Sequence, residues 1–124
     1  MFVSINETKW PIVIIKFNST NITQNTFNDY LHNFIKLFEK NKCFNIIIDG
    51  SSITKFPIKY AIQHAKFLKK TKHLIEQYIQ KSAVIIQNNK VKNIMNIITK
   101  IAPPTSDLII TDSINEARNH TLII

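Results

Sequence analysis

Two aspartates each follow a short apolar run of the kind that forms a buried strand, and they are the first candidates for chemistry. Asp49 follows residues 46–48, and Asp112 follows residues 107–111. Open α/β sheets bind ligands at the carboxyl ends of their strands, and two carboxylates there could hold Mg²⁺ through their oxygen atoms. The competing interpretation is local, because aspartate also caps turns and helix starts. We favour the local interpretation, since Ser113, itself a good helix cap, directly follows Asp112.

A nucleophile paired with a base is the second kind of chemistry to consider. Ser51, Ser52 and Cys43 are possible nucleophiles, but His64 lies about two turns into the helix predicted to follow them. The glycine-flanked elbow that exposes a catalytic serine is missing, and a single glycine cannot build a phosphate-binding loop. The four histidines lack the i, i+4 pairs or nearby cysteines of a zinc site. We therefore predict that the chain is not an enzyme and binds neither a metal nor a cofactor.

Lysine is concentrated in one stretch that supplies most of the positive charge. Residues 55–81 hold seven lysines and one glutamate, in a chain of net charge +8. Such a concentration attracts nucleic acid by counterion release, and an acidic lipid surface or an acidic protein is an equal possibility. The alternative is that these lysines form an ordinary solvated helix face without a partner. Ile, Asn and Lys supply 25, 14 and 15 of the 124 residues, and their A/T-rich codons indicate that the excess of lysine reflects the base composition of the genome. On a helix, five of these lysines lie mostly opposite the apolar positions and form an exposed basic strip: Lys55, Lys59, Lys66, Lys69 and Lys70.

The length is typical of one domain, and no linker or repeat divides the chain, so we expect a single domain over residues 1–124. One cysteine excludes an internal disulfide. The apolar runs reach only four or five residues, whereas a membrane span needs about 20. Glu7 lies where a signal peptide would be apolar. We therefore expect a cytoplasmic protein without a transmembrane segment.

Hydrophobic periodicity predicts a simple order of elements. Residues 2–6 and 10–17 form a hairpin, because both are rich in β-branched and aromatic side chains and a polar turn separates them. A helix follows, with Thr26 as its expected N-cap. Further strands over 45–49, 83–87 and 107–111 alternate with helices, and Ser113 opens the last of these helices. The order β-β-α-β-α-β-α-β-α predicts an α/β fold with a mainly parallel sheet and helices packed on it.

The second predicted helix carries both the basic strip and an apolar face. Pro57 suits its first turn. The stretch 69–81 has no glycine, so the helix either continues or kinks near Thr71. Apolar side chains at helical spacing predict the buried face of this helix: Ile58, Ala61, Ile62, Ala65 and Leu68.

The element order and two short segments resemble the STAS domain, the family of bacterial anti-sigma factor antagonists and of the cytoplasmic tails of sulfate transporters. The first segment is the apolar run ending at Asp49, followed by residues 53–56 at the place of the family's short second strand. The second segment, 112–117, is similar to the closing S-x-x-E-A helix start of the family. The resemblance covers nearly the whole chain. It implies a STAS-like fold in a family that binds proteins, and sometimes nucleotides, without chemistry of its own.

One motif of the family is missing. In STAS domains a D-S-S-G segment carries the serine or threonine that a partner kinase phosphorylates, and the matching positions here are Pro57-Ile58-Lys59-Tyr60. We therefore expect no phosphorylation switch there. Ser51 and Ser52 lie about six residues too early to take over this role.

These observations lead to an expected function and two alternatives. We expect a non-catalytic STAS-like module for protein interaction or regulation. The first alternative is an accessory protein that binds a polyanion, either nucleic acid or acidic lipid, through the basic second helix. The second is a small enzyme with its site at Asp49 and Asp112. For the expected module, the partner surface lies where the buried strand ends and the second helix begins, at Asp49, Gly50, Ser51, Ser52, Phe56, Lys59 and Tyr60.

Overall fold

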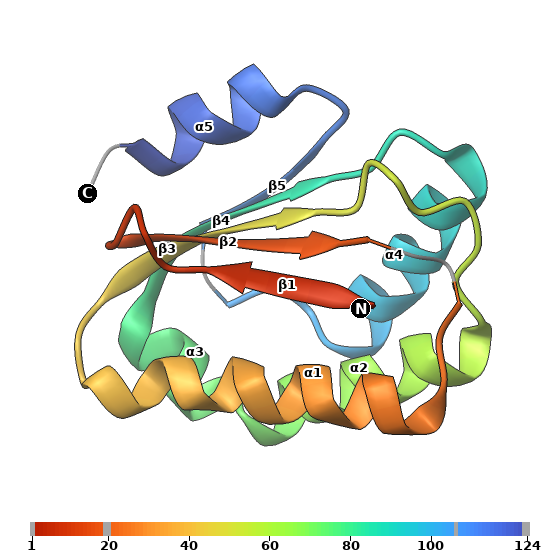
Figure 1. The fold of residues 1–124 in the computed structure, drawn as a ribbon, viewed down its shortest axis with the longest axis horizontal. Helices are drawn as coiled ribbons and strands as arrows, with labels where there is room; N and C mark the ends of the chain where they lie inside the picture. Colours follow the sequence, from red (N-terminus) through yellow and green to blue (C-terminus); the bar gives the residue numbers. More distant parts are fainter. Residues whose placement is uncertain (1, 19–20, 106, 123–124) are drawn as a thin grey trace.

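A five-stranded sheet runs through the computed structural model, which describes residues 2–18, 21–105 and 107–122 (Figure 1). The strands lie in the order β1-β2-β3-β4-β5. β1 pairs antiparallel with β2, and the other neighbouring pairs are parallel. The predicted hairpin and the mainly parallel α/β sheet are therefore confirmed. The strands are β1 (Val3–Asn6), β2 (Ile12–Phe17), β3 (Phe44–Asp49), β4 (Ile79–Ile85) and β5 (Asp107–Thr111).

The helices lie on the two faces of the sheet in unequal numbers. From β2 onward each strand lies beside the next one in sequence, so every crossover moves across the sheet in the same direction. Right-handed crossovers of this kind place their helices on one face. Figure 1 shows α1 to α4 on that face and α5, which follows the last strand, on the other. The helices are α1 (Gln24–Lys36), α2 (Ile58–Lys70), α3 (Lys72–Tyr78), α4 (Asn89–Ile101) and α5 (Ile114–Leu122), with the 3₁₀ helix η1 (Leu37–Lys40) directly after α1.

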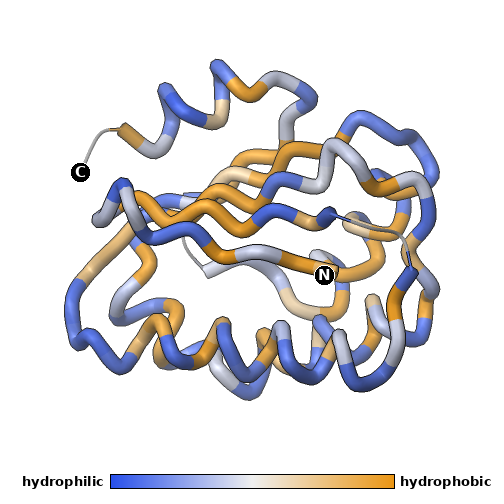
Figure 2. Tube along the Cα trace, in the orientation of Figure 1, coloured by the Kyte–Doolittle hydropathy of each residue, from blue (hydrophilic) through white to orange (hydrophobic). Residues whose placement is uncertain are grey.

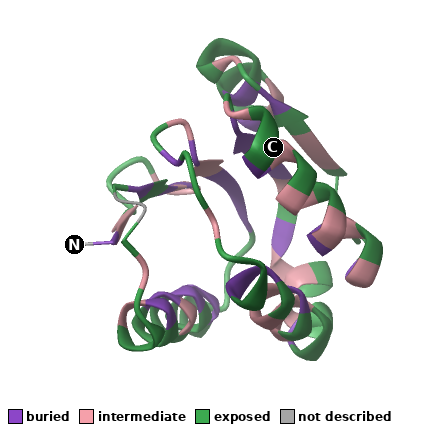
Figure 3. Cartoon of the chain, turned by 90° about the vertical axis from the view of Figure 1, so that its right-hand side faces the viewer, coloured by how far each residue is buried: buried purple, intermediate pink, exposed green. Residues whose placement is uncertain are grey.

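Most of the core lies between the sheet and the larger helical layer, and aromatic rings dominate it. A smaller cluster of Ile47, Ala83, Ile85 and Ala117 lies between the sheet and α5. β3 and β4 are therefore largely buried on both faces, as their unbroken apolar runs predict, and Figures 2 and 3 show these central strands as hydrophobic and mostly buried. Within the described ranges no helix is long and apolar enough to cross a membrane. The buried rings of the larger core are those of Phe2, Phe17, Phe27, Tyr30, Phe34, Phe38, Phe44 and Tyr60.

The start of α1 differs from the prediction. Thr26 is the third residue of the helix, and its N-cap is Thr23. Thr23 Oγ1 accepts a hydrogen bond from the Thr26 amide, and Thr26 Oγ1 accepts one from the Thr23 amide. This reciprocal capping box satisfies two amides that a helix start leaves free. The prediction was wrong because threonine occurs at both ends of the first turn, and only the earlier one precedes the helix.

The middle of the chain bears on the family resemblance and on the second helix. Residues 53–56, which lie at the place of the family's short second strand, form no strand. Of the two alternatives left open for the second helix, continuation or a kink near Thr71, the structure shows an interruption, because α2 ends at Lys70 and α3 begins at Lys72. The Thr71 hydroxyl donates to the carbonyl of Phe67 at 2.8 Å, a side-chain bond that often bends helices.

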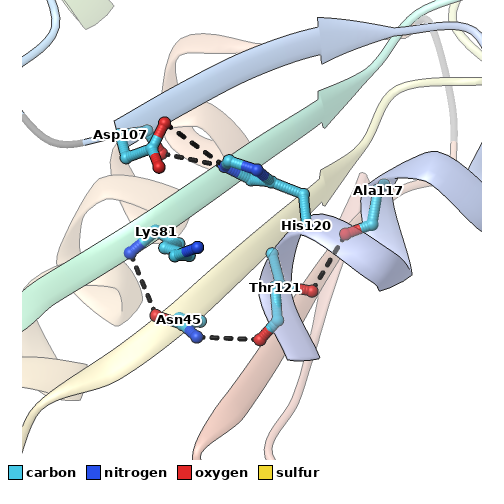
Figure 4. Close-up of polar contacts among 6 residues, drawn as sticks. All are labelled: Asn45, Lys81, Asp107, Ala117, His120 and Thr121. Atoms are coloured by element: carbon cyan, nitrogen blue, oxygen red, sulfur yellow. Dashed lines mark hydrogen bonds and ion pairs between the residues drawn. The ribbon is translucent and has the colours of Figure 1, made fainter. Parts of the chain in front are cut away.

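β4 begins at Ile79 and ends at Ile85, whereas the predicted strand covers residues 83–87. Its pairing with β3 shifts register between Phe44 and Ile46, and Asn45 lies at this irregularity. Asn45 is 1% exposed. Its Oδ1 accepts the Lys81 amide at 2.9 Å, and its Nδ2 donates to the carbonyl of Thr121 at 2.8 Å (Figure 4). One buried amide side chain therefore joins β3, β4 and the end of α5.

Candidate functional site

The first four predicted partner-binding residues form a tight turn after β3. Asp49 Oδ1 accepts a hydrogen bond from the Ser51 amide at 3.0 Å, so the carboxylate caps this turn. The Gly50 amide donates to the Ile85 carbonyl at 2.8 Å. A Cβ atom at Gly50 would lie 3.1 Å from that same carbonyl oxygen, which explains why glycine occurs here. Ser52 is exposed at the tip of the turn.

The other three predicted residues have different surroundings. Tyr60 is 3% exposed and packs against Phe27, with 5.1 Å between ring centroids. Its side chain is therefore a core element and offers no surface to a partner. Lys59 is exposed, and its Nζ lies over the Tyr60 ring at 4.9 Å from the centroid. Phe56 is half-buried and lines an internal cavity together with Gly50.

The two strand-end aspartates lie on different strands with β4 between them. Neighbouring strands are about 4.8 Å apart, so the backbones at Asp49 and Asp112 are separated by roughly two such spacings. In the part of the chain that the structure describes, no three His, Cys, Asp or Glu side chains form a group that could hold a metal ion.

The outward face of α2 combines positive charge with exposed apolar surface. The basic strip residues Lys55, Lys59, Lys66, Lys69 and Lys70 are all exposed, but Lys55 precedes the helix, so four of the five lie on α2. Ile58 and Ile62 are 55% and 37% exposed, so their predicted burial is wrong. The predicted burial of Ala61 and Ala65 is confirmed, and Tyr60 is the buried residue of α2 that the prediction missed. The aromatic ring of Tyr60 occupies the core, and this turns the two isoleucines outward, one helical turn apart.

A cavity of about 440 Å³ lies between the sheet and the larger helical layer. Its walls come from the strands β2 to β5 and from the helices α1 to α4. Nearly all of the lining side chains are apolar, such as Ile46, Val84, Met95 and Leu108. This volume lies within the range of small-molecule sites, about 300–1,000 Å³.

One polar pair lines the cavity. Tyr30 Oη and His64 Nε2 form a hydrogen bond of 2.8 Å, and the two rings stack with centroids 5.6 Å apart. His64 Nδ1 is buried and has no hydrogen-bond partner among the residues that the structure describes. Burial lowers the pKa of His64 to about 4, so the imidazole is neutral at physiological pH. Burial also raises the pKa of Tyr30.

Sequence reasoning did not identify this pair. Tyr60, His64 and Phe67 recur at i, i+4 and i+7, and this spacing was the available signal that His64 faces the core. The isoleucine pattern at Ile58 and Ile62 fits the same helix almost equally well, so the two possible faces could not be ranked from periodicity alone. The partner Tyr30 lies 34 residues earlier in the chain, and no local pattern connects it with His64.

The fold and its surfaces define an α/β protein with a mixed five-stranded sheet, a basic apolar helix face and an internal cavity. A scan against protein-family models and a search of curated proteins both found no match. The functional argument therefore depends on the geometry of this chain.

Proposed function

We propose that this chain is a non-catalytic STAS-like module that binds an acidic protein partner through the outward face of α2. The observation that carries the proposal is the pair Ile58 and Ile62, exposed on the same helix face as four lysines of the basic strip. Among the described residues, none of the strip lysines forms an ion pair. Their charges are therefore available to carboxylates of a partner.

The combination of residue types favours a protein over a bare polyanion. Protein interfaces place an apolar centre inside a polar rim, and complementary charge steers the partners together. On α2 the two isoleucines supply the apolar centre of such an interface, and Lys59, Lys66 and Lys69 beside them supply its polar rim. A phosphate backbone would use the lysines and leave the isoleucines without a contact.

The STAS-like assignment is supported by the order of elements and by the two segments that resemble the family. The turn at Asp49 follows β3, and the Ser113 side chain accepts a hydrogen bond from the Glu116 amide at 3.2 Å at the start of α5. No serine or threonine lies at 57–60, where the family carries its phosphorylated residue. We therefore propose that phosphorylation at these positions does not control partner binding.

A polyanion is the second candidate, and the exposed strip of five lysines is the observation that favours it. Each lysine that contacts a phosphate releases a counterion, so the affinity for duplex DNA would fall with a log–log salt slope of about −0.9 per contact. A protein interface with an apolar centre depends less on salt. The two candidates therefore differ in how they respond to salt and to loss of the isoleucines.

The test compares two variants of α2 with two matched controls elsewhere. Ile58→Ser/Ile62→Ser removes the apolar centre, and Ile35→Ser, an exposed isoleucine of α1, is its control. Lys59→Glu/Lys66→Glu/Lys70→Glu reverses the strip. Its control reverses three exposed lysines of other helices in the same way: Lys36, Lys90 and Lys100.

The measurements are affinity capture from the native source, with cross-links mapped by mass spectrometry, and gel shift with duplex DNA at ~150 mM salt. We expect capture of an acidic protein that is cross-linked to α2, is lost in both α2 variants and is kept in both controls. Tight DNA binding that disappears in the triple lysine variant and is unchanged in the isoleucine variant would replace the first candidate by the second.

A further inference from the structure

The internal cavity has the shape and lining of a site for a hydrocarbon chain. Its floor is the helical-layer face of the sheet, with Ile46 and Ile48 of β3, Val84 of β4 and Leu108 of β5. Its walls include Leu68 of α2. A methylene group occupies about the volume of a water molecule in the liquid, roughly 30 Å³, so the 440 Å³ cavity has room for up to about 15 carbons, and a chain of about twelve fits. Two acyl chains would exceed this volume.

The cavity opens to the surface beside two lysines. Among the residues that line it, Lys69, Lys72 and residues 103–105 are exposed. The opening therefore lies between the junction of α2 with α3 and the segment that precedes β5. Lys72 is paired only with the exposed Glu76, at 3.8 Å, and such surface pairs are weak. Both ammonium groups can therefore bind an anion at the opening.

The polar pair inside the cavity decides which end of an amphipathic ligand enters. His64 is neutral and hydrogen bonded to Tyr30, so it brings no positive charge into the cavity. Burying a carboxylate without a cation is costly. A charged head group is therefore more stable at Lys69 and Lys72, with the chain inside.

We propose that the cavity binds a single-chain aliphatic carboxylate of about twelve carbons, with the chain between the sheet and α2 and α4 and the carboxylate at Lys69 and Lys72. The chain removes its apolar surface from water in a site that is already formed, which is the main source of affinity. The two lysines then supply the preference for an anion. This site overlaps the partner surface proposed for α2 at Lys69 alone, because Ile58, Ile62, Lys59, Lys66 and Lys70 do not line the cavity.

Isothermal titration with dodecanoate, below its micelle concentration, tests the site. We expect one molecule bound per chain with a Kd of about 10 µM or tighter. Dodecanol, which has the same chain and no charge, is expected to bind about tenfold more weakly. Failure to detect dodecanoate binding at ~1 mM would overturn the proposal.

Charge reversal tests the position of the carboxylate. Lys69→Glu/Lys72→Glu is expected to weaken dodecanoate binding about tenfold or more. The matched control Lys66→Glu/Lys70→Glu changes the net charge of the chain equally, but neither residue lines the cavity, so its effect is expected to stay within about twofold at ~0.15 M salt, where the Debye length is about 8 Å. Equal losses in both variants would show a general charge effect and would overturn the assignment of the head group.

Filling the cavity tests the position of the chain. Leu108→Trp places a large ring in the cavity from β5, and Ile110→Trp on the same strand places one at an exposed position outside it. Thermal unfolding establishes that both variants fold. We expect the first to lose dodecanoate binding and the second to keep it, and normal binding by a folded Leu108→Trp protein would contradict the proposal.

His64→Phe distinguishes the two orientations of the ligand. An apolar ring in place of the imidazole makes the surroundings of the chain more apolar and is expected to increase the affinity for dodecanoate. A loss of about tenfold or more would place the carboxylate inside, at His64, and would overturn the orientation proposed here.

The same acyl chemistry occurs in free fatty acids and in single-chain lipids of a membrane. Vesicles of phosphatidylglycerol that contain lysophosphatidylglycerol separate the two sources. Binding of dodecanoate without transfer of the lysolipid would identify the free acid and support the proposal. Lysophosphatidylglycerol carries a phosphodiester in place of the carboxylate, so its transfer, blocked by Leu108→Trp, in the absence of dodecanoate binding would overturn the carboxylate as the head group.

Discussion

His64 is a histidine held neutral inside an apolar cavity by its surroundings. Its Nε2 is bonded to the Tyr30 hydroxyl, its Nδ1 is buried, and the rings of Phe27 and Phe67 lie within 6.3 Å of the imidazole centroid. Desolvation disfavours the imidazolium form, and this lowers the pKa to about 4. Because of this residue, we expect the folded protein to become less stable at acidic pH.

The pH dependence of stability follows from this pKa. Above pH 6.5, His64 is neutral in both the folded and the unfolded chain, so its titration does not change the free energy of unfolding. As the pH falls from 6.5 towards 4, only the unfolded chain takes up the proton, so the free energy of unfolding decreases. We expect a loss of about 1–3 kcal/mol over this range from His64 alone.

Urea unfolding of the native protein and of His64→Phe, at several pH values between 7 and 4, measures this contribution. All other titrating groups are common to the two proteins, so the difference between their pH profiles isolates His64. The native protein should lose stability more steeply between pH 6.5 and 4. Parallel profiles would contradict the burial of this imidazole.

At the residue scale, the sequence predicts those roles that depend on neighbours in the chain. The turn-capping role of Asp49 and the helix-capping role of Ser113 follow from residue type and position, and both are present. The burial of Tyr60 and the pairing of Tyr30 with His64 depend on how α1 and α2 pack together. Side chains 34 residues apart meet there, and no local pattern encodes that distance.

At the scale of elements, α5 is held on its own face of the sheet by a few specific contacts. Ala117 packs into the small cluster over Ile47. At the other end of the helix, Asn45 donates to the carbonyl of Thr121 at 2.8 Å, and His120 Nε2 lies 3.2 Å from the backbone oxygen of Asp107 (Figure 4). The buried amide therefore carries much of the specificity with which α5 docks.

Asn45→Ala should destabilise the protein and loosen α5 first. The substitution leaves the Lys81 amide and the Thr121 carbonyl without their side-chain partner, and each unsatisfied buried group costs about 1–3 kcal/mol. We expect a total loss of roughly 2–4 kcal/mol. Hydrogen exchange should also become faster in α5 than in α4, which Asn45 does not contact.

Asn18→Ala, an exposed asparagine that follows β2, is the control for this substitution and is expected to change stability by no more than ~0.5 kcal/mol. A similar loss in both variants, or unchanged exchange in α5, would show that the buried amide does not anchor the helix.

Elements were easier to predict from the sequence than their faces. Strand β5 matches its predicted limits, and the kink at Thr71 is present. The lysines of α2 are exposed as predicted, but Ile58 and Ile62 were wrongly assigned to the buried face, because isoleucine is so frequent in this chain that these two residues mimic a core pattern. Periodicity identifies a helix, but the bulk of the neighbouring side chains decides which of two similar faces turns inward.

At the scale of the whole molecule, the order of elements predicts the layers but not the space between them. Crossovers in one direction place α1 to α4 on one face, and the sequence pattern is sufficient for that step. Ala61 and Ala65 of α2 pack against Ile98 of α4, and Ile98 also lines the cavity. The distance between the helical layer and the sheet depends on many such contacts together, so the cavity could not be predicted from the sequence.

The whole molecule also carries an uncompensated positive charge. Sixteen basic residues face eight acidic ones, and the lysine–carboxylate pairs among the described residues are Lys40 with Glu7 and Lys72 with Glu76. Self-repulsion in a compact chain of net charge +8 opposes folding. Salt screens this repulsion, since the Debye length falls from about 30 Å at 0.01 M to about 10 Å at 0.1 M.

We therefore expect the melting temperature to rise between about 10 and 300 mM NaCl. In Lys59→Glu/Lys66→Glu/Lys70→Glu, each reversal changes the charge by two units, so the net charge falls from +8 to about +2 and the repulsion that salt relieves becomes small. This variant should melt at the same temperature as the native protein or higher at low salt, and it should show a weaker salt dependence. Differential scanning calorimetry of both proteins across the salt series measures the effect. If the melting temperature of the native protein falls with salt, screening removes more attraction than repulsion, and local ion pairs outweigh the net charge. Equal salt dependence in the two proteins would likewise contradict the role of the net charge.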